Sequence, residues 1–316
     1  MRAAFYNERG DIENLEIGDR PKPVPGDGEV LIKIRAAAVG AWDVHVMKGG
    51  FGNPPLPMIP GCEVAGVVEV GNKGSDFKPG EKVYGGLGFK SGGFAEYASA
   101  AADHVARMPE GVRFEEAAAL VVSAGTAYEG LIDRAQLQEG ETVLVTAASG
   151  GVGSAAVQIA AAIGAQVRGV ASARNHDYIR DLGVCESFDY NDPDWASRLK
   201  ESLPEGVDVL FDGAGGRTRD VAVQALKNGG RGVFIVGAPP GLPPGTRAFE
   251  FSADVTRDRL ENITALVEKG ALKAQIEAVR PLEEAREAMA HVGKGHTRGR
   301  VVLNVRSAHE AGEPPE

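Results

Sequence analysis

Cysteine is scarce in this sequence, with Cys62 and Cys185 the 2 in 316 residues. So few thiols cannot build the disulfide framework of a small secreted domain, and they indicate a reducing compartment. Long apolar runs are also missing: there is no stretch of about 18 apolar residues, and the N-terminal segment lacks the apolar core of a signal peptide. We therefore predict a cytoplasmic protein with no membrane partner.

The chain also lacks an excess of positive charge, since its formal net charge is −10. This charge argues against nucleic acid as a main partner. Aromatic residues make up only 6%, whereas glycine occurs 43 times. That composition suits a turn-rich β part joined to an α/β part packed through small residues. The length is sufficient for two domains, each with its own core.

The most informative stretch is residues 141–164, ETVLVTAASGGVGSAAVQIAAAIG. Its apolar run Val143–Val145 predicts a buried parallel strand, and apolar residues at helical spacing follow a turn of small residues. Strand, glycine turn and helix together match the dinucleotide-binding fingerprint, because a backbone without bulky side chains lets a diphosphate approach the helix N-terminus. The predicted cofactor-binding residues of this turn are Ser149, Gly150, Gly151, Val152 and Gly153.

The first third of the chain has the pattern of a β-rich domain. Short strand-like runs lie between turns rich in glycine and proline, namely 29–34, 64–70, 82–84 and 94–98. Such spacing favours a barrel-like all-β arrangement.

The motifs AAAVGAWDVH, IPGCEVAGVVEVG, KPGEKVYG, GGFAEYA and AASGGVGSAAVQIA occur in this order along the chain. The chain thereby resembles the medium-chain dehydrogenase/reductase superfamily, and most of all its zinc-free quinone oxidoreductase and enone reductase branch. The resemblance implies an α/β fold with a GroES-like β-barrel-type catalytic domain and a doubly wound parallel-sheet Rossmann domain. The expected boundaries are 1–122 completed by 267–305, and 123–266. The polar stretch 306–316 is expected to be a flexible tail.

Zinc-dependent members of the superfamily hold a catalytic metal at positions that match Gly40, Cys62 with Glu63, and Val122 here. A catalytic zinc needs three protein ligands, and only the adjacent Cys62 and Glu63 have suitable chemistry. Two cysteines cannot form the structural four-cysteine site either. We therefore predict no metal, and interpret Cys62 as an inert residue rather than a reactive thiol.

By resemblance, three residues of one segment are the catalytic candidates. Trp42 matches the hydroxyl-bearing relay residue, cannot pass a proton, and either lines the substrate pocket or belongs to the core. Asp43 either orders the loop or acts as a base. His45 matches the outer relay histidine and either donates a proton through water or is structural.

The strand predicted at 166–171 decides the choice of nicotinamide cofactor. An NAD-preferring site carries a carboxylate at the end of this strand, but the residue here is Ala171. Ser172 and Arg174 follow and can bind a 2′-phosphate, although Arg174 also fits a plain surface charge. By resemblance, Tyr190 contributes as well. We predict NADPH, with Asp189 as the one feature that argues against it.

Other cofactor contacts are expected where strands of the sheet end. The predicted strands at 207–212 and 231–237 end in glycine-rich turns, which place Gly213 at the cofactor groove. By resemblance, Val236 and Gly237 lie near the nicotinamide, and Arg300 lies near the diphosphate or on the surface. Thr126 is expected to start a helix and bind the nicotinamide-side phosphate.

The sequence therefore predicts an NADPH-dependent, metal-independent reductase of quinones or α,β-unsaturated carbonyls, small-molecule substrates that accept hydride. The alternatives are a carbonyl reductase or alcohol dehydrogenase, and a non-catalytic NADPH-binding protein. Relatives are commonly dimers, so a homodimer is expected.

Overall fold

The computed structural model describes residues 1–50, 54–88 and 92–305, so the expected tail at 306–316 lies outside the described residues. Contacts divide the chain into two compact units. Of the described residues, those within 1–122, 255–268 and 274–305 form the first unit, and those within 123–254 and 269–273 form the second.

Helix α7, Arg257–Glu268, groups with the first unit, although the sequence placed the boundary at 266. The Tyr84 hydroxyl donates to the Leu260 carbonyl at 2.6 Å. The Arg257 guanidinium donates to the carbonyls of Ala102 and Val105. These bonds give α7 partners from the first unit that its own amphipathic pattern did not reveal.

The first unit is organised around the long strand β3, Glu29–Val39. It pairs antiparallel with β4 (Glu63–Gly71), β6 (Tyr97–Ala101) and β15 (Arg300–Asn304). The sheet continues through β5 (Lys82–Gly86) to β7 (Val105–Arg107), and on the other side to β14 (Ile276–Pro281), while β1 (Arg2–Tyr6) and β2 (Leu15–Asp19) form a separate pair.

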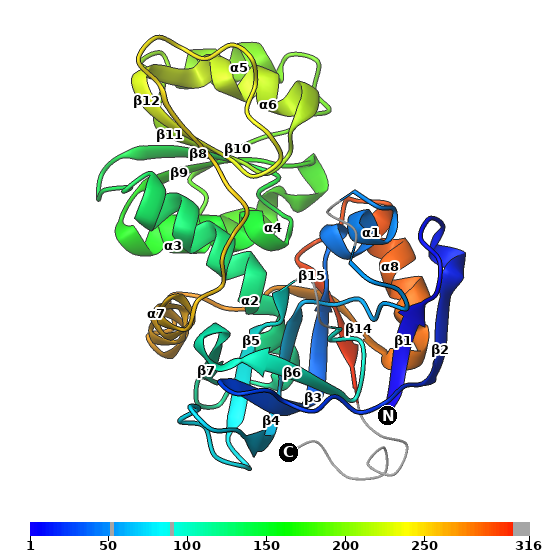
Figure 1. The fold of residues 1–316 in the computed structure, drawn as a ribbon. Coiled ribbons are helices and arrows are strands. Elements are labelled where there is room, and N and C mark those ends of the chain that lie inside the picture. Colours follow the sequence, from blue (N-terminus) through cyan, green and yellow to red (C-terminus); the bar gives the residue numbers. More distant parts are fainter. Residues whose placement is uncertain (51–53, 89–91, 306–316) are drawn as a thin grey trace. The chain divides into compact units, whose positions relative to one another are not determined.

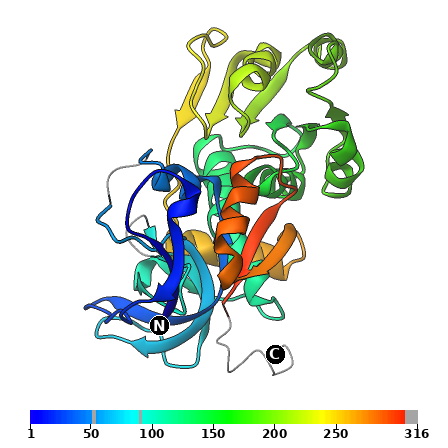
Figure 2. The same ribbon diagram turned by 90° about the vertical axis from the view of Figure 1, so that its right-hand side faces the viewer.

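Two helices of this unit, α1 (Ala41–Met47) and α8 (Ala285–Gly293), contact each other. Figure 2 shows α8, in orange, alongside the red strand β15. Strand β6 starts three residues later than the expected strand 94–98, because the backbone of Phe94 pairs instead with Pro60 and Ala4.

The second unit contains a six-stranded sheet in the order β10-β9-β8-β11-β12-β13. All its neighbouring strands are parallel, which confirms the predicted doubly wound sheet. The order runs outward from β8 in both directions, so it reverses between β8 and β11, where open α/β sheets bind ligands. The strands are β8 (Thr142–Thr146), β9 (Gln166–Val170), β10 (Glu186–Phe188), β11 (Val207–Asp212), β12 (Leu226–Phe234) and β13 (Arg247–Glu250).

Helices cover both faces of this sheet. In Figure 1, α3 (Gly151–Ile163) and α4 (His176–Asp181) lie on one face, and α5 (Trp195–Ser202) and α6 (Gly216–Ala222) lie on the other. One cluster of the apolar core between these layers includes Leu144, Val170, Trp195, Leu210 and Phe234.

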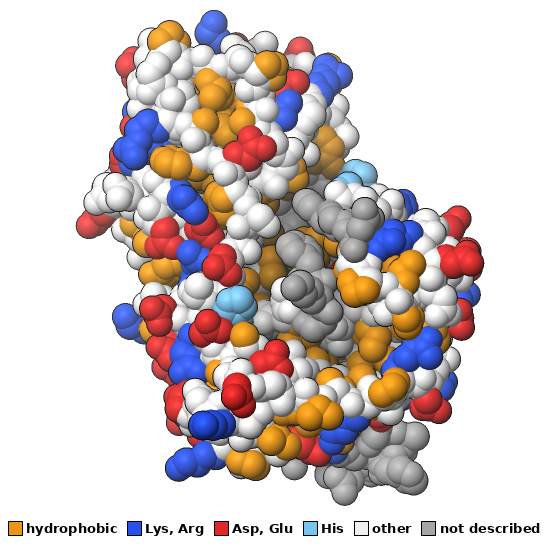
Figure 3. Space-filling model, in the orientation of Figure 1, with side chains coloured by type: hydrophobic (Ala, Val, Ile, Leu, Met, Phe, Trp, Pro, Cys, Tyr) orange, Lys and Arg blue, Asp and Glu red, His pale blue; other side chains and the backbone are white. Residues whose placement is uncertain are grey.

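Among the helices that the structure describes, none is both long and apolar enough to span a bilayer. On the face drawn in Figure 3, acidic and basic side chains are interspersed.

Candidate active site

The glycine turn between β8 and α3 leaves the helix N-terminus open to a ligand. The N-cap of α3 is Gly150, and no side chain caps the helix. The turn is closed by the Gly150 N–H, which donates to the Ala147 carbonyl at 2.9 Å, with Ala147 itself in the left-handed region at φ 50°. A Cβ on Gly153 would lie 2.1 Å from that same carbonyl oxygen, so only glycine allows α3 to pack this closely. The residues present therefore fit a nucleotide diphosphate.

A buried amide joins this turn to the end of β9. Asn175 Nδ2 donates to Ser149 Oγ at 3.0 Å and to Ser172 Oγ at 3.3 Å. Two of the predicted cofactor residues are thus brought together by Asn175, which the sequence did not single out. Arg174, next to it, is exposed at the surface.

Asp189 lies beside the end of β9. The Ala171 N–H donates to the carbonyl of Phe188, so Asp189 follows the last paired residue of β10. Its carboxylate accepts from the backbone of Ala173 and from both nitrogens of Asn191, and these bonds hold its pKa below the ordinary value against the effect of desolvation. Tyr190 packs its ring against the core of this unit.

The ends of β8 and β11 are joined by a second buried network. Thr146 Oγ1 donates to Asp212 Oδ1 at 2.5 Å and accepts from the N–H of Gly213. Burial raises the pKa of Asp212, whose carboxylate also accepts from Gly215. The network fixes the glycine-rich turn after β11. After β12, Val236 is 52% exposed and Gly237 has φ +95° with open space around it.

Thr126 does not start a helix, contrary to the prediction. It lies in the last turn of α2, Phe114–Tyr128, and is buried. Its N–H therefore belongs to the helix interior and not to a free N-terminus. The helix begins at Phe114, twelve residues before Thr126.

The core of the first unit contains a fully buried carboxylate, Glu63, with 0% exposure. Its Oε2 accepts from the N–H of Val122 in α2 at 2.8 Å, and its Oε1 accepts from the guanidinium of Arg300. Burial raises the pKa of Glu63 to about 7, although Arg300 and the Val122 N–H both act in the opposite direction. Glu63 is a charged residue at the start of a mostly apolar strand, and the sequence analysis did not recognise it as one half of a buried ion pair.

Arg300 is therefore not the predicted ligand of a cofactor diphosphate. It is 6% exposed, pairs with Glu63, and holds its guanidinium carbon 4.9 Å from the centroid of the Trp42 ring. The preceding Gly299 has φ +78°, and a Cβ there would lie 2.3 Å from the Gln275 carbonyl oxygen. This glycine lets β15 begin where Arg300 points into the core.

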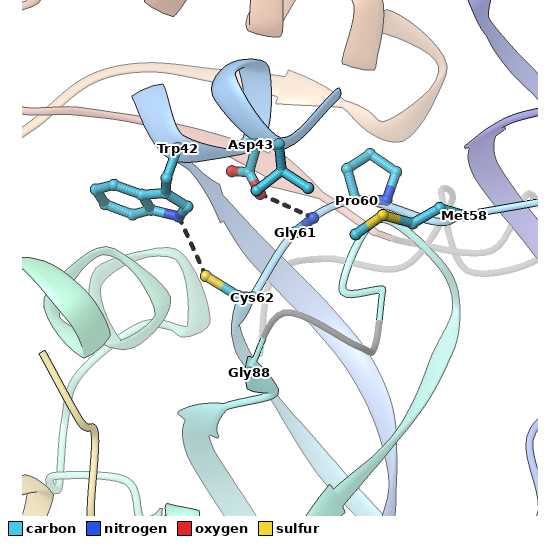
Figure 4. Close-up of a pocket in the computed structure, with 8 residues that line it drawn as sticks. Trp42, Asp43, Met58, Pro60, Gly61, Cys62 and Gly88 are labelled. Atoms are coloured by element: carbon cyan, nitrogen blue, oxygen red, sulfur yellow. Dashed lines mark hydrogen bonds between the residues drawn. The ribbon is translucent and has the colours of Figure 1, made fainter. Parts of the chain in front are cut away.

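Trp42 occupies the space that a side chain at position 40 would need. A Cβ on Gly40 would lie 2.1 Å from Cε2 of the indole. The indole N–H donates to Cys62 Sγ at 3.1 Å, as Figure 4 shows. Both residues line a small pocket with Asp43, Val46, Met58, Pro60, Gly61 and Gly88.

Asp43 orders the backbone around this pocket. Its two carboxylate oxygens accept from the N–H groups of Gly40 at 2.8 Å and Gly61 at 3.0 Å. Burial raises its pKa from 3.8 to about 6, while these two bonds and Arg300 lower it. Both oxygens are thus engaged, which favours the predicted loop-ordering role over that of a base.

His45 does not join Trp42 and Asp43 at the pocket. It lies on the exposed side of α1, and its imidazole packs against the backbone of Gly50. The three candidates therefore split between the pocket, which Trp42 and Asp43 line, and the exposed side of α1.

The positions that match the ligands of a catalytic zinc are occupied in other ways. Position 40 is filled by the Trp42 ring, and the Glu63 carboxylate is engaged by Arg300 and Val122. Over residues 1–50, 54–88 and 92–305, no three His, Cys, Asp or Glu side chains are grouped so that they could hold a metal ion. The residues present do not fit the zinc site of zinc-dependent relatives.

Comparison with known proteins identifies the family. Residues 26–110 match the alcohol dehydrogenase GroES-like domain, and residues 182–303 match the zinc-binding dehydrogenase family. Human quinone oxidoreductase is 34% identical over 323 residues, which covers 96% of this chain and 97% of the human protein. The chain belongs to the medium-chain dehydrogenase/reductase superfamily. Members of this superfamily are oxidoreductases, and the zinc-binding dehydrogenase match indicates a nicotinamide cofactor.

Two further relatives within this superfamily are named for different activities. The NADPH-dependent alkenal/one oxidoreductase of Arabidopsis thaliana is 32% identical and covers 96% of this chain and 79% of its own length. A solved structure described as an NAD-dependent alcohol dehydrogenase superposes with a TM-score of 0.90 at 31% identity, covering 97% of this chain and 100% of that one.

We expect Arg300→Met to lower the free energy of unfolding by about 3–5 kcal/mol, because it leaves Glu63 buried without its counter-charge. Urea denaturation measures this loss. The double variant Glu63→Gln with Arg300→Met should recover most of it, and Arg217→Met, at an exposed arginine, should change little. A loss below about 1 kcal/mol for Arg300→Met, the size of a surface pair, would contradict a buried ion pair.

The raised pKa of Asp43 predicts a pH-dependent stability. Between about pH 4 and about pH 6 the Asp43 carboxyl is protonated in the native state, whereas in the unfolded chain it has released its proton. The contribution of Asp43 to the free energy of unfolding therefore declines as pH rises through this window. The stability of wild type relative to Asp43→Asn should therefore fall by at most about 3 kcal/mol between about pH 4 and 7. Asp19→Asn, at an exposed position, provides the control. A difference that stays constant with pH would refute the shift.

Proposed function

We propose that this protein is an NADPH-dependent reductase of quinones or α,β-unsaturated carbonyl compounds that works without a bound metal. The observation that carries the proposal is the packing of the Trp42 ring against Gly40, together with the two bonds that engage Glu63. These contacts occupy position 40 and the Glu63 carboxylate, both of which match ligand positions of a catalytic zinc.

The expected chemistry suits such a site. A reduced nicotinamide, when bound, supplies a hydride, and a conjugated carbonyl compound accepts it at a carbon that needs no Lewis acid. The residues of the chain then have to bind the substrate, orient it toward the nicotinamide and keep water out of the site. The lining by Val46, Met58 and Pro60 supports an apolar substrate, and the small size of the pocket supports entry of only one end of it.

The alternative is reduction of simple ketones or oxidation of alcohols. The name of the solved alcohol dehydrogenase with a similar fold supports this alternative. A simple carbonyl needs stronger polarisation of its oxygen than a conjugated one, and no metal would provide it here. The names of the human and Arabidopsis relatives also favour quinones and enones.

The cofactor preference rests on the end of β9. Ala171 offers no carboxylate to a ribose hydroxyl, Ser172 offers a hydroxyl, and Arg174 is exposed and able to reach a phosphate. Asp189 is the opposing charge, but its carboxylate is already held by Asn191 and the Ala173 backbone.

Edge strand β13 supports a homodimer, the assembly we propose. It pairs on one side with β12 and is the last strand of the six-stranded sheet. Such an edge offers unpaired backbone groups to a second copy.

Replacing Arg174 with Ala should raise KM for NADPH about tenfold, because the bond to a charged phosphate is lost, and should leave KM for NADH nearly unchanged. Initial rates with each cofactor at a fixed quinone concentration measure both. Arg180→Ala is the matched control, since that arginine is exposed but pairs with Asp177. Equal effects of Arg174→Ala on both cofactors would refute NADPH selection by this residue.

The proposed activity is tested with purified protein, NADPH, and either 1,4-benzoquinone or 2-cyclohexen-1-one in excess EDTA. We expect oxidation of NADPH that added zinc does not increase. Two outcomes would overturn the proposal: no turnover across both substrates, or turnover that EDTA abolishes and zinc restores.

A further inference from the structure

The polar group that faces the pocket without a strong partner is the indole N–H of Trp42. An indole nitrogen only donates hydrogen bonds, and its acceptor here is the Cys62 sulfur at 3.1 Å. Burial raises the pKa of the Cys62 thiol well above its ordinary value, and the nearby carboxylates of Asp43 and Glu63 act in the same direction. The sulfur therefore stays a neutral thiol, which is a weak acceptor.

We propose that the Trp42 N–H leaves the Cys62 sulfur on substrate binding and donates to the carbonyl oxygen of the substrate. This inference rests on the proposed function, because it assumes a substrate with a carbonyl group. An oxygen with partial negative charge accepts more strongly than a thiol, and the bond strengthens as that oxygen gains charge during reduction. The hydrogen stays on the indole nitrogen throughout, so Trp42 donates a hydrogen bond and no proton.

The indole is held in the position that this role requires. On one side it packs against the backbone of Gly40, where even a Cβ would clash with the ring. The Arg300 guanidinium lies 4.9 Å from its ring centroid. A cation over the ring is attracted to its π electrons, and its positive field makes the N–H a better donor. A donor fixed in advance needs no reorganisation when charge develops on the substrate.

The other polar group of the pocket does not compete for this hydrogen bond. Both carboxylate oxygens of Asp43 are engaged by backbone N–H groups. In Figure 4, Met58 and Pro60 lie across the pocket from Trp42 and Cys62. Among the described residues, the pocket therefore has a donor held only by a thiol sulfur at one end and an apolar wall at the other, which matches a small molecule with a carbonyl at its end.

Nuclear magnetic resonance can observe this N–H directly, because the chain has only 2 tryptophans. A ¹H–¹⁵N spectrum of the full-length protein without cofactor should show two indole signals, and Trp42→Phe assigns them. Cyclohexanone, which has a carbonyl but no conjugated double bond to reduce, is the probe. We expect the Trp42 signal to shift in a saturable manner, and the signal of Trp195, buried in the core of the second unit, to stay in place.

Two variants sharpen the experiment. Cys62→Ala removes the acceptor that competes with the ketone, so cyclohexanone should bind a few-fold more tightly. Trp42→Phe keeps an aromatic ring but loses the donor, so kcat with 2-cyclohexen-1-one should fall about 100-fold with a smaller change in KM. Trp195→Phe is the matched control and should retain kcat.

The proposal is overturned if cyclohexanone leaves the Trp42 signal unmoved at every concentration, or if Trp42→Phe keeps wild-type kcat. The binding experiment needs neither cofactor nor turnover. A shift of the Trp42 signal in a protein that reduces no quinone or enone would therefore retain the carbonyl site and reject only the proposed reaction.

Discussion

The buried carboxylate of Glu63 ties together three segments of the first unit that are far apart in the sequence. A charge with 0% exposure is unfavourable unless hydrogen bonds and an opposite charge compensate for it. The compensation comes from the N–H of Val122 in α2 and from Arg300 in β15, which are 59 and 237 residues away in sequence. One side chain thus joins β4, α2 and the last strand of the chain, and the return of the C-terminal segment to the first unit has a physical reason.

The same ion pair shapes the pocket. Arg300 reaches Glu63 and also lies over the Trp42 ring, whose other neighbour is the bare backbone of Gly40. At position 40, which matches a zinc ligand of the zinc-dependent relatives, this chain has a glycine whose side-chain space is filled by the Trp42 indole. Gly40, Trp42, Glu63 and Arg300 depend on one another. A larger residue at position 40 would displace Trp42, and loss of Arg300 would leave Glu63 without its counter-charge.

Much of the fold could be predicted because its signals are local. The run Val143–Val145, the glycine turn and the helix after it lie within 24 consecutive residues, 141–164, and the structure confirms all three. Boundaries that depend on distant partners were harder to predict. Strand β6 starts at Tyr97 because Phe94 pairs with Pro60 and Ala4, and α7 joins the first unit through Tyr84.

In the candidate site, too, roles that depend on local contacts could be predicted and roles that depend on distant partners could not. For Asp43, loop ordering was one of the two expected roles, and its bonds to the backbone of Gly40 and Gly61 support it. Arg300 was expected near the diphosphate from resemblance and Thr126 was expected to start a helix, and both expectations were wrong. For His45, the role of proton donor was one of two alternatives and came from resemblance as well. The contacts that decide their roles are Glu63 for Arg300, the exposed side of α1 for His45, and the unbroken helix α2 for Thr126.

We propose that hydride passes from a nicotinamide to a conjugated carbonyl compound in metal-free protein. The most direct measurement uses NADPH carrying deuterium at the transferable C4 position, 2-cyclohexen-1-one, and protein whose zinc content is determined by mass spectrometry. We predict one deuterium per product molecule at the β-carbon, in protein with far less than one zinc per chain. A product without deuterium, or a yield of labelled product that rises in proportion to bound zinc, would contradict the account.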